Sequence, residues 1–294
     1  YPGGASLKFL DTHALIRKYD IRPKKSLGQN FLVEPSGLRK VLQAAELKGD
    51  KQVLEIGAGL GSLTVLLAQN AREVIAIEID QTLFPALQEA ISKYKNVKTT
   101  QGDILELDLK TLLSDEPFVV IANIPYYITS AIIRKLLEAQ KRPSHMILTI
   151  QKEVAERIIA RDGKMSLLAL SVQVYGKAEL VANIPAGAFY PKPDVDSAVL
   201  KLSLYDKPII DEEKLSVFFD LATAGFSQRR KTLRNTISAG MAISSQQAEE
   251  LLTSAGIDPK RRAETLSLEE WKKLVSVYCA TPSIATSIKQ KQKI

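Results

Sequence analysis

The sequence predicts an α/β protein in which a mostly parallel sheet is followed by a small all-helical domain. From residue 35 to about residue 205, short apolar segments alternate with amphipathic helices, which is typical of βαβ units. From about residue 211 to residue 279, only helical periodicity remains. We therefore expect an N-terminal extension over 1–26, an α/β domain over 27–207, a helical domain over 208–280 and a disordered tail over 281–294.

The elements of the α/β part follow from apolar runs and from helix signals. A weak helical pattern precedes Asp20, and Pro35 suits the first turn of a helix that runs to Leu47. We expect strands at 53–56, 74–79, 97–100, 118–122 and 145–150, and helices at 63–68, 85–94 and 130–139. The segments 179–184 and 198–204 are expected to pair as antiparallel neighbours.

Composition is that of an ordinary globular protein with a basic surplus. The net charge of +7 favours a polyanionic partner, although on charge alone a protein that binds no polyanion is equally plausible. No apolar run reaches the roughly 18 residues that a membrane span requires, and no secretory signal is visible. A single cysteine, Cys279, suits a reducing compartment, and His13 and His145 lack metal-ligand spacing. We expect a cytoplasmic monomer without membrane or metal.

A glycine-rich turn follows the first strand of the α/β part. Gly57, Gly59 and Gly61 let the backbone come close to a ligand, and Glu78 near the end of the next strand can accept hydrogen bonds from ribose hydroxyls. The turn lacks the Gly-Lys-Ser/Thr of a phosphate loop, and Ser62 stands where a dinucleotide fingerprint has its third glycine. This pattern favours an adenosine ligand without phosphates, such as S-adenosylmethionine. NAD, or a plain tight turn, is the alternative.

Polar residues at two further places fit the same ligand. Asp103, followed by Ile104, comes after the third strand, where a carboxylate can accept from an adenine amino group. Gln29 and Asn30 put amide side chains just before the first helix. Taken singly, Asp103 also reads as a turn residue and the amides as part of a helix-entry loop. Together with the glycines they indicate a cofactor site.

The segment Asn123-Ile124-Pro125-Tyr126 closes the fourth strand and predicts the chemistry. An adenine N6 nitrogen is a poor nucleophile, and two acceptors on its hydrogens, the Asn123 side-chain oxygen and the Ile124 carbonyl, would direct its lone pair at a methyl donor. Pro125 fixes the backbone, and Tyr126 can stack on the base. The alternative is a stiff turn whose tyrosine packs on the core. Phe189 is a candidate for the other face of the base, or for packing.

Basic residues concentrate in the helical part. Arg229, Arg230, Lys231 and Arg234 are expected to begin its second helix and to contact phosphates, with a second cluster at 260–262. A solvated helix face is the alternative.

These motifs together resemble the ribosomal RNA adenine N6,N6-dimethyltransferases that act on 16S rRNA. The resemblance covers about residue 27 to residue 279, and it includes 28–32, 55–61, 123–126, 189–197 and 226–235. It implies a Rossmann-like class I methyltransferase domain and a C-terminal helical domain that contacts rRNA. It implies that the cofactor site is lined by Asn30, Leu32, Gly57, Glu78, Asp103 and Asn123.

The resemblance also implies a target and leaves two rivals. Two adjacent adenosines in the 3′-terminal hairpin of 16S rRNA, within an immature small subunit, would each receive two methyl groups. Tyr127, which follows the Asn123–Tyr126 segment, is also similar to the erythromycin-resistance methylases of 23S rRNA. A non-catalytic RNA-binding or transcription factor on the same fold is the second rival, against which the intact Asn123–Tyr126 segment argues.

Overall fold

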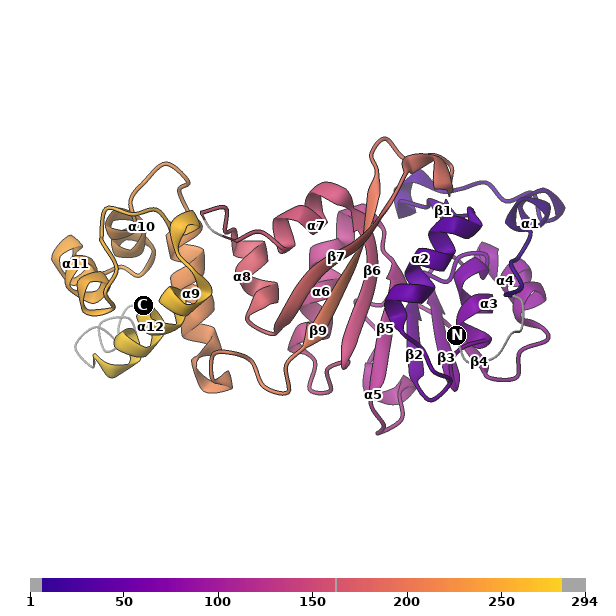
Figure 1. Ribbon diagram of the computed structural model, residues 1–294, viewed down its shortest axis with the longest axis horizontal. Helices are drawn as coiled ribbons and strands as arrows, with labels where there is room; N and C mark the ends of the chain where they lie inside the picture. Colours follow the sequence, from indigo (N-terminus) through magenta and orange to yellow (C-terminus); the bar gives the residue numbers. More distant parts are fainter. Residues whose placement is uncertain (1–6, 162, 282–294) are drawn as a thin grey trace. The chain divides into compact units, whose positions relative to one another are not determined.

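The computed structural model describes residues 7–161 and 163–281, which form two compact units (Figure 1). The first, here called the α/β unit, runs up to Ala155 and includes Ala178–Leu204. The second, the helical unit, contains Glu156–Lys177 and the chain from Tyr205 onward. Of the tail expected over 281–294, residues 282–294 lie outside the described residues.

Seven strands of the described chain form one sheet in the order β4-β3-β2-β5-β6-β9-β7. Their bounds are β2 Gln52–Ile56, β3 Glu73–Glu78, β4 Val97–Gln101, β5 Phe118–Asn123, β6 His145–Gln151, β7 Gly176–Ile184 and β9 Ser197–Leu204. The strands β4, β3, β2, β5 and β6 are mutually parallel, and β9 runs antiparallel to β6. This order confirms the expected α/β fold and places β7 beside β9, as expected.

Helices cover the sheet because its central strands are apolar on both faces. Every residue of β2 is buried, as are the first five of β5, which is typical of parallel strands between helix layers. One large core joins α2, α3 and α4 to alternate residues of the central strands. The helices of this unit are α1 Thr12–Lys18, α2 Pro35–Ala45, α3 Ser62–Ala68, α4 Phe84–Ile91, α5 Leu109–Leu112, α6 Thr129–Glu138 and most of α7 Lys152–Ile158.

Short elements that the sequence analysis did not predict complete the α/β unit. A two-stranded antiparallel sheet pairs β1, Phe31–Leu32, with β8, Phe189–Tyr190. The 3₁₀ turns of this unit are η1 Lys25–Leu27, η2 Gln81–Leu83, η3 Tyr126–Ile128 and η4 Ala186–Ala188, and the helical unit contains η5 Glu212–Lys214 and η6 Ala263–Thr265. Two-residue strands carry no detectable periodicity, which is why the sequence does not indicate them.

The helical unit packs around Trp271, whose side chain is fully buried. Its helices are α8 Leu167–Gln173, α9 Leu215–Phe226, α10 Leu233–Gly240, α11 Ser245–Ser254 and α12 Leu268–Ala280. Phe226 stacks on Trp271 with ring centroids 6.0 Å apart. Ser244 and Ser267 each form a capping box, which satisfies amide groups at the starts of α11 and α12.

The division of the chain differs in one respect from the expected boundary. Residues 156–177 were expected in the α/β domain over 27–207, yet they belong to the helical unit. The reason is packing: α8 buries its apolar residues against α9, and the Met165 amide donates to the Glu264 carbonyl at 3.1 Å. The expected boundary near 206–210 marks only the second passage of the chain into this unit.

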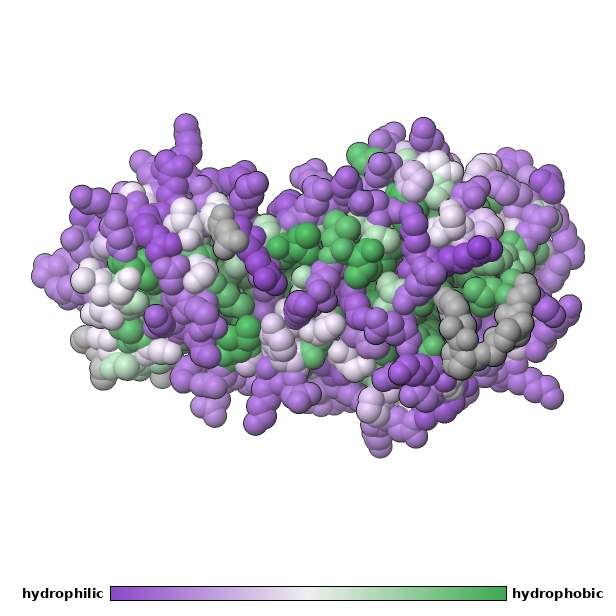
Figure 2. All heavy atoms as spheres, in the orientation of Figure 1, coloured by the Kyte–Doolittle hydropathy of each residue, from purple (hydrophilic) through white to green (hydrophobic). Residues whose placement is uncertain are grey.

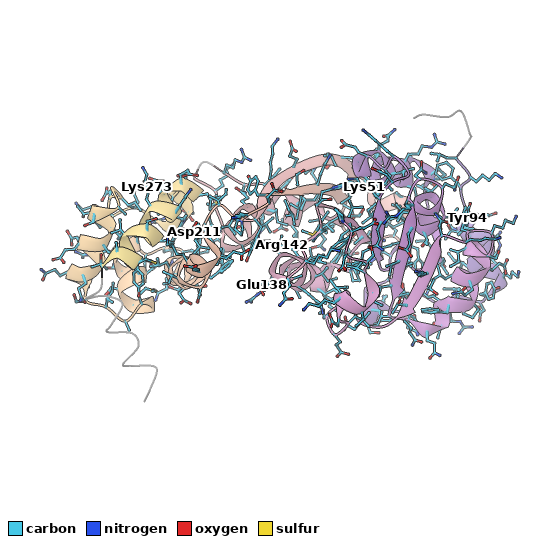
Figure 3. The ribbon with its side chains drawn as sticks, turned by 90° about the horizontal axis from the view of Figure 1, so that it is seen from below. Lys51, Tyr94, Glu138, Arg142, Asp211 and Lys273 are labelled. Atoms are coloured by element: carbon cyan, nitrogen blue, oxygen red, sulfur yellow. The ribbon has the colours of Figure 1, made fainter. Side chains whose placement is uncertain are left out.

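The exposed surface is mostly hydrophilic. On the face drawn in Figure 2, hydrophilic residues cover most of the surface. Charged side chains such as Glu138 and Lys273 project from the ribbon in Figure 3. None of the helices within residues 7–161 and 163–281 is both long enough and apolar enough to cross a membrane.

Candidate active site

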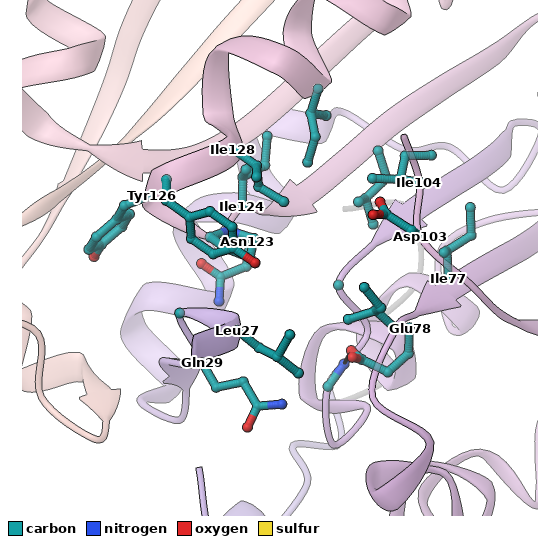
Figure 4. A pocket seen from close by; sticks show the side chains of 18 of the residues that line it. Leu27, Gln29, Ile77, Glu78, Asp103, Ile104, Asn123, Ile124, Tyr126 and Ile128 are labelled. Atoms are coloured by element: carbon teal, nitrogen blue, oxygen red, sulfur yellow. Dashed lines mark hydrogen bonds between the residues drawn. The ribbon is translucent and has the colours of Figure 1, made fainter. Parts of the chain in front are cut away.

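A pocket lies at the carboxyl ends of the parallel strands of the α/β unit (Figure 4). The strand order reverses there, because β2 has β3 on one side and β5 on the other, and such switch points are where open α/β sheets bind ligands. The loops after β2, β3, β4 and β5 supply most of the wall, and the segment before β1 supplies the rest. The pocket is lined by residues 27–31, 56, 57, 59, 77–79, 102–104, 123–128 and 132.

The glycine turn after β2 lies against the end of β5. Gly57 has φ of +78° and Gly59 has φ of +57°, in the left-handed region that favours glycine. A Cβ at Gly57 would lie 3.2 Å from the backbone oxygen of Asn123, so a side chain here would press on the neighbouring strand end. The Gly57 amide donates to the Ile77 carbonyl at 2.9 Å, which ties the turn to β3. The turn thus leaves backbone exposed to the pocket.

Two carboxylates face the pocket from β3 and from the loop after β4. Glu78 is 5 % exposed and accepts from the Gly59 amide at 2.7 Å and from the Asp80 amide at 2.9 Å. Burial raises the pKa of Glu78, and these backbone hydrogen bonds oppose the rise. Asp103 accepts from the Leu105 amide at 2.8 Å through Oδ1. Each of these oxygens can accept a further hydrogen bond from a ligand hydroxyl or amine.

The lining also has a distinctive charge. Among the described residues that line the pocket there is no Lys, Arg or His, whereas Glu78 and Asp103 are both present. Pyrophosphate sites need donors and positive potential, so this wall suits a neutral or cationic adenosine ligand better than a dinucleotide. The residues therefore fit S-adenosylmethionine, with its ribose hydroxyls and its cationic sulfonium. No group of three or more metal-ligating side chains occurs within the described residues.

The Asn123–Tyr126 segment closes the other side of the pocket. The Asn123 side chain donates through Nδ2 to the Asn30 carbonyl at 3.0 Å, which leaves Oδ1 as the acceptor that can face a substrate amine. The Ile124 amide donates to the Thr149 carbonyl at 3.1 Å, so β6 fixes the peptide that leads into Pro125. The structure therefore brings the Asn123 side chain, the Ile124 backbone and the glycine turn to one pocket.

Tyr126 and Tyr127 stand side by side in the chain but have different surroundings. The Tyr126 hydroxyl is 2.9 Å from Ser197 Oγ, and Ser197 is fully buried at the start of β9. Burial raises the pKa of Tyr126, so its phenol stays neutral. Tyr127 is 62 % exposed and also lines the pocket. Sequence reasoning named Tyr126 and gave Tyr127 no part in the site, although two adjacent aromatics were a visible signal.

Two residues expected at the site lie in the core instead. Phe189 is 4 % exposed, belongs to the main apolar core and does not line the pocket. Leu32, its partner in the β1–β8 pair, is 5 % exposed and packs in the same core. Strand alternation explains this, because Phe189 points inward while Tyr190 is 39 % exposed. The structure therefore gives Phe189 a packing role, and Phe31 lines the pocket where Leu32 was expected.

The other expected site residues divide between direct lining and support. Asn30, Gly57, Gly59, Glu78, Asp103 and Ile104 all line the pocket, as expected. Gln29 also lines it, yet its amide is used within the protein: Nε2 donates to Asp80 and Oε1 accepts from the Lys24 amide, each at 2.7 Å. Sequence reasoning did not find Asp80, because a carboxylate two residues beyond Glu78 reads as a solvated loop residue.

Three of the four basic residues expected to begin the second helix of the helical unit lie instead in the turn before it. Arg229, Arg230 and Lys231 are exposed between α9 and α10, and α10 begins only at Leu233. Arg234, on α10, pairs with Glu249 at 3.0 Å. In the second cluster, Arg261 is bound to Glu270 and to the Thr265 carbonyl. The three turn residues are therefore exposed to solvent, as are Lys260 and Arg262 of the second cluster.

Comparison with known proteins gives the family of the chain. The family model for ribosomal RNA adenine dimethylase matches residues 21–279. A ribosomal RNA small subunit methyltransferase A from Dehalococcoides mccartyi is 46% identical over 91% of this chain and 92% of its own. The protein of the same name from a Geobacillus species is 41% identical over 90% of this chain and 94% of its own.

Solved structures show the same fold. A dimethyladenosine transferase from Plasmodium falciparum is 27% identical, with a TM-score of 0.74 over 84% of this chain and 96% of its own. The 23S rRNA methyltransferase ErmE is 28% identical, with a TM-score of 0.69 over 84% of this chain and 99% of its own. With the match to residues 21–279 and curated relatives above 40% identity, the chain belongs to the ribosomal RNA adenine dimethylase family.

Proposed function

We propose that this enzyme transfers methyl groups from S-adenosylmethionine to the N6 amino groups of two adjacent adenosines in the 3′-terminal hairpin of 16S rRNA. The product is N6,N6-dimethyladenosine, and the substrate is an immature small ribosomal subunit. The protein acts in the cytoplasm as a monomer. One observation carries the proposal: the Asn123–Tyr126 segment lines the same pocket as the glycine turn, Glu78 and Asp103.

The pocket wall supports the choice of cofactor. Glu78 would accept from ribose hydroxyls, Asp103 from the adenine amino group, and Gly57 and Gly59 would admit the ligand close to the backbone. The cofactor supplies a methyl group on a positively charged sulfur. Two carboxylates and a lining without cationic side chains favour such a ligand, since a positive charge next to a carboxylate is stabilised.

The chain's own groups would make the adenine nitrogen reactive. In the first transfer the Asn123 Oδ1 and the Ile124 carbonyl would accept the two N6 hydrogens, and in the second transfer one of them would accept the single hydrogen that remains, so that the nitrogen lone pair points at the methyl carbon. The N–C bond would form as the C–S bond of the methyl donor breaks, with its electron pair left on sulfur, and the proton lost from nitrogen would pass to water. Tyr126 stacks on the base, which is worth about 1–3 kcal/mol. Fixed acceptors of this kind act without a strong general base.

Sequence similarity supports 16S rRNA over 23S rRNA as the target. The curated relatives named for the small subunit are 39–46% identical to this chain, against 28% for ErmE, the 23S rRNA methyltransferase. For RNA binding of either kind, the exposed turn at 229–231 offers three cations for phosphate contacts in the helical unit. RNA phosphates bound in this way make affinity fall steeply with salt.

Methyl transfer to isolated subunits tests the proposal. The protein is incubated with labelled S-adenosylmethionine and, in separate reactions, with small subunits that lack dimethyladenosine or with large-subunit precursors, and the rRNA is digested for nucleoside mass spectrometry. We expect dimethyladenosine in 16S rRNA. Label found only in 23S rRNA of large-subunit precursors would establish the resistance-type rival, and RNA binding without transfer would establish the non-catalytic one.

A variant separates catalysis from binding. Asn123→Ala removes one acceptor and is expected to reduce the transfer rate about 100- to 1,000-fold, the usual cost of losing one fixed group in such a site. RNA affinity should change little, because the exposed turn lies in the other unit. The matched control is Asn183→Ala, which alters an exposed amide side chain on β7, away from the pocket. Equal transfer rates for Asn123→Ala and the parent would refute the assigned role of Asn123.

A further inference from the structure

The segment Lys24–Asn30 forms one wall of the cofactor pocket and is fastened to the sheet at both ends. Leu27, Gly28, Gln29 and Asn30 line the pocket. In Figure 4, Leu27 and Gln29 lie on one side of the pocket, and Asp103 and Ile104 lie on the other. We call this segment the wall loop.

The first fastening is Asp80, which follows β3. Its side chain is 3 % exposed, and it accepts from Lys24 Nζ and from Gln29 Nε2, each at 2.7 Å. Thr82 completes the set with its amide at 3.0 Å and its hydroxyl at 2.7 Å. Burial acts to raise the pKa of Asp80, but the hydrogen bonds from Lys24, Thr82 and Gln29 outweigh it and hold the pKa at about 2. The carboxylate is therefore ionised at any working pH.

The second fastening is on β5, at the residue that would hold the substrate amine. The Asn30 carbonyl accepts from Asn123 Nδ2 at 3.0 Å. Gly28 packs under Tyr127, since a Cβ at Gly28 would lie 3.1 Å from the Tyr127 ring. The position of the wall loop therefore sets both the cofactor wall and the orientation of the Asn123 amide.

Inside the wall loop, the hydrogen bonds form a closed set. The Gln29 side chain links the Lys24 amide to Asp80, while the Leu27 and Gln29 amides donate to the Lys24 carbonyl and the Gly28 amide donates to the Lys25 carbonyl. Lys24 and Gln29, the two wall-loop residues that donate to Asp80, are thus joined to each other by hydrogen bonds within the loop. When the buried carboxylate that holds the Lys24 end of this loop is neutralised, that part of the loop can open as a unit while Asn30 stays bound to Asn123.

We propose that Asp80 is a positioning residue for the cofactor: it latches the wall loop over the pocket and so limits how fast the cofactor leaves. The inference rests on the proposed use of S-adenosylmethionine. Asp80 touches neither the pocket nor the reacting atoms, since it is not among the lining residues. Its effect passes through Lys24 and Gln29 to Asn30. Removing the latch destabilises the closed loop, which speeds cofactor release more than it slows methyl transfer.

Two variants test the latch with the full-length protein. Asp80→Asn keeps the shape of the side chain and removes its charge, and Lys24→Met removes the cation from a side chain that is 42% exposed and so tolerant of change. Glu89→Gln is the matched control: it breaks another contact of the N-terminal segment, with Lys18 and Tyr19, which lies away from the pocket. Two readouts are used, amide hydrogen exchange without ligand and the dissociation rate of S-adenosylhomocysteine.

Both latch variants are expected to accelerate exchange of the Leu27, Gly28 and Gln29 amides, while the strand amides of β2 stay protected. They should also raise the dissociation rate of S-adenosylhomocysteine about 10- to 100-fold, the range for a lost charge-assisted hydrogen bond. The double variant should release ligand no faster than Asp80→Asn alone, because the two residues act through one contact. Glu89→Gln should match the parent in both readouts.

Three results would overturn the inference and leave the proposed cofactor in place. Unchanged exchange at Leu27–Gln29 would mean that Asp80 does not hold the loop. Faster exchange with an unchanged dissociation rate would mean that the loop does not retain the cofactor. If Glu89→Gln changed amide exchange and the dissociation rate as much as the latch variants do, both changes would reflect general destabilisation of the protein. A parent protein that does not bind S-adenosylhomocysteine at all would instead overturn the proposed cofactor, and the inference with it, even though the exchange experiment gave the expected pattern.

Discussion

Replacing Glu55 by Gln changes a carboxyl group inside the α/β unit without changing its shape. Glu55 lies in β2, two residues before Gly57, and is 1 % exposed. Its Oε2 has no hydrogen-bond partner within the described residues. Burial raises the pKa of Glu55 to about 8, and the nearby charge of Glu78 adds to the rise. Near neutral pH the group is therefore mostly protonated in the folded protein.

The size of the effect follows from proton linkage. The ordinary pKa of the carboxyl is 4.5 and the folded value is about 8, so between these values the folded state holds one more proton than the unfolded state. The free energy of unfolding then falls by about 1.4 kcal/mol for each pH unit, or about 2.7 kcal/mol from about pH 5.5 to about pH 7.5. Below pH 4.5 no penalty remains, and above about 8 it is complete. The Gln variant lacks this slope.

The assay must report on the unit that contains Glu55. The only tryptophan of the chain, Trp271, lies in the helical unit, so its fluorescence follows unfolding of that unit. Hydrogen exchange of the β2 amides follows the α/β unit. We expect the parent and Glu55→Gln to diverge as pH rises when β2 is observed, and to stay parallel when Trp271 is observed.

A matched control removes the general effect of charge. Glu106→Gln, at an exposed carboxylate of the same unit, should keep the pH slope of the parent. If the free energy of unfolding of Glu55→Gln falls with pH as steeply as that of the parent, Glu55 is not the protonated group and the argument from burial fails.

Three further predictions concern the site and the RNA surface. Gly57→Ala puts a residue with a Cβ at a left-handed φ of +78°, which destabilises the folded protein by about 1–2 kcal/mol. The variant should have a lower melting temperature and a lower cofactor affinity, both measured by calorimetry. Ser197→Ala removes the hydrogen-bond partner of the Tyr126 hydroxyl and should raise KM for RNA by up to about tenfold at unchanged kcat, since one net hydrogen bond is lost. An unchanged KM would show that Ser197 does not hold the Tyr126 ring in place for the base. Replacing Arg229 or Arg230 by Ala should weaken RNA binding and reduce its salt slope by about one unit each in filter-binding titrations, whereas an unchanged slope would exclude phosphate contact.

Much of the α/β fold could be predicted because its signals are local. Buried parallel strands such as 118–122 are continuous apolar runs, and Pro35 and the glycine turn mark where helices and ligand loops begin. The assignment of residues 156–177 to the helical unit could not be predicted. It depends on which surface α8 covers, and the apolar pattern of α8 is the same whether it packs on the sheet or on α9.

The site divides in the same way. Residues that act through a distinctive local pattern, such as Gly57, Glu78 and Asn123, were found from the sequence and line one pocket. For Phe189 the sequence left base stacking and packing open, because a two-residue strand gives no alternation from which to read the direction of its side chain. Asp80 was missed because its importance comes from burial under Lys24 and Gln29, which are distant in sequence.

The split of the helical unit along the chain has a consequence for protein synthesis. Residues 156–177 leave the ribosome before α9 to α12, the helices with which they form a unit, have been made. At elongation rates of about 5–20 residues per second, the stretch from Lys177 to the end of α9 at Phe226 takes roughly 2 to 10 seconds to make. During that interval the apolar face of α8 lacks the helix on which it packs. A nascent chain of this enzyme therefore exposes this apolar face to chaperones until α9 has been made.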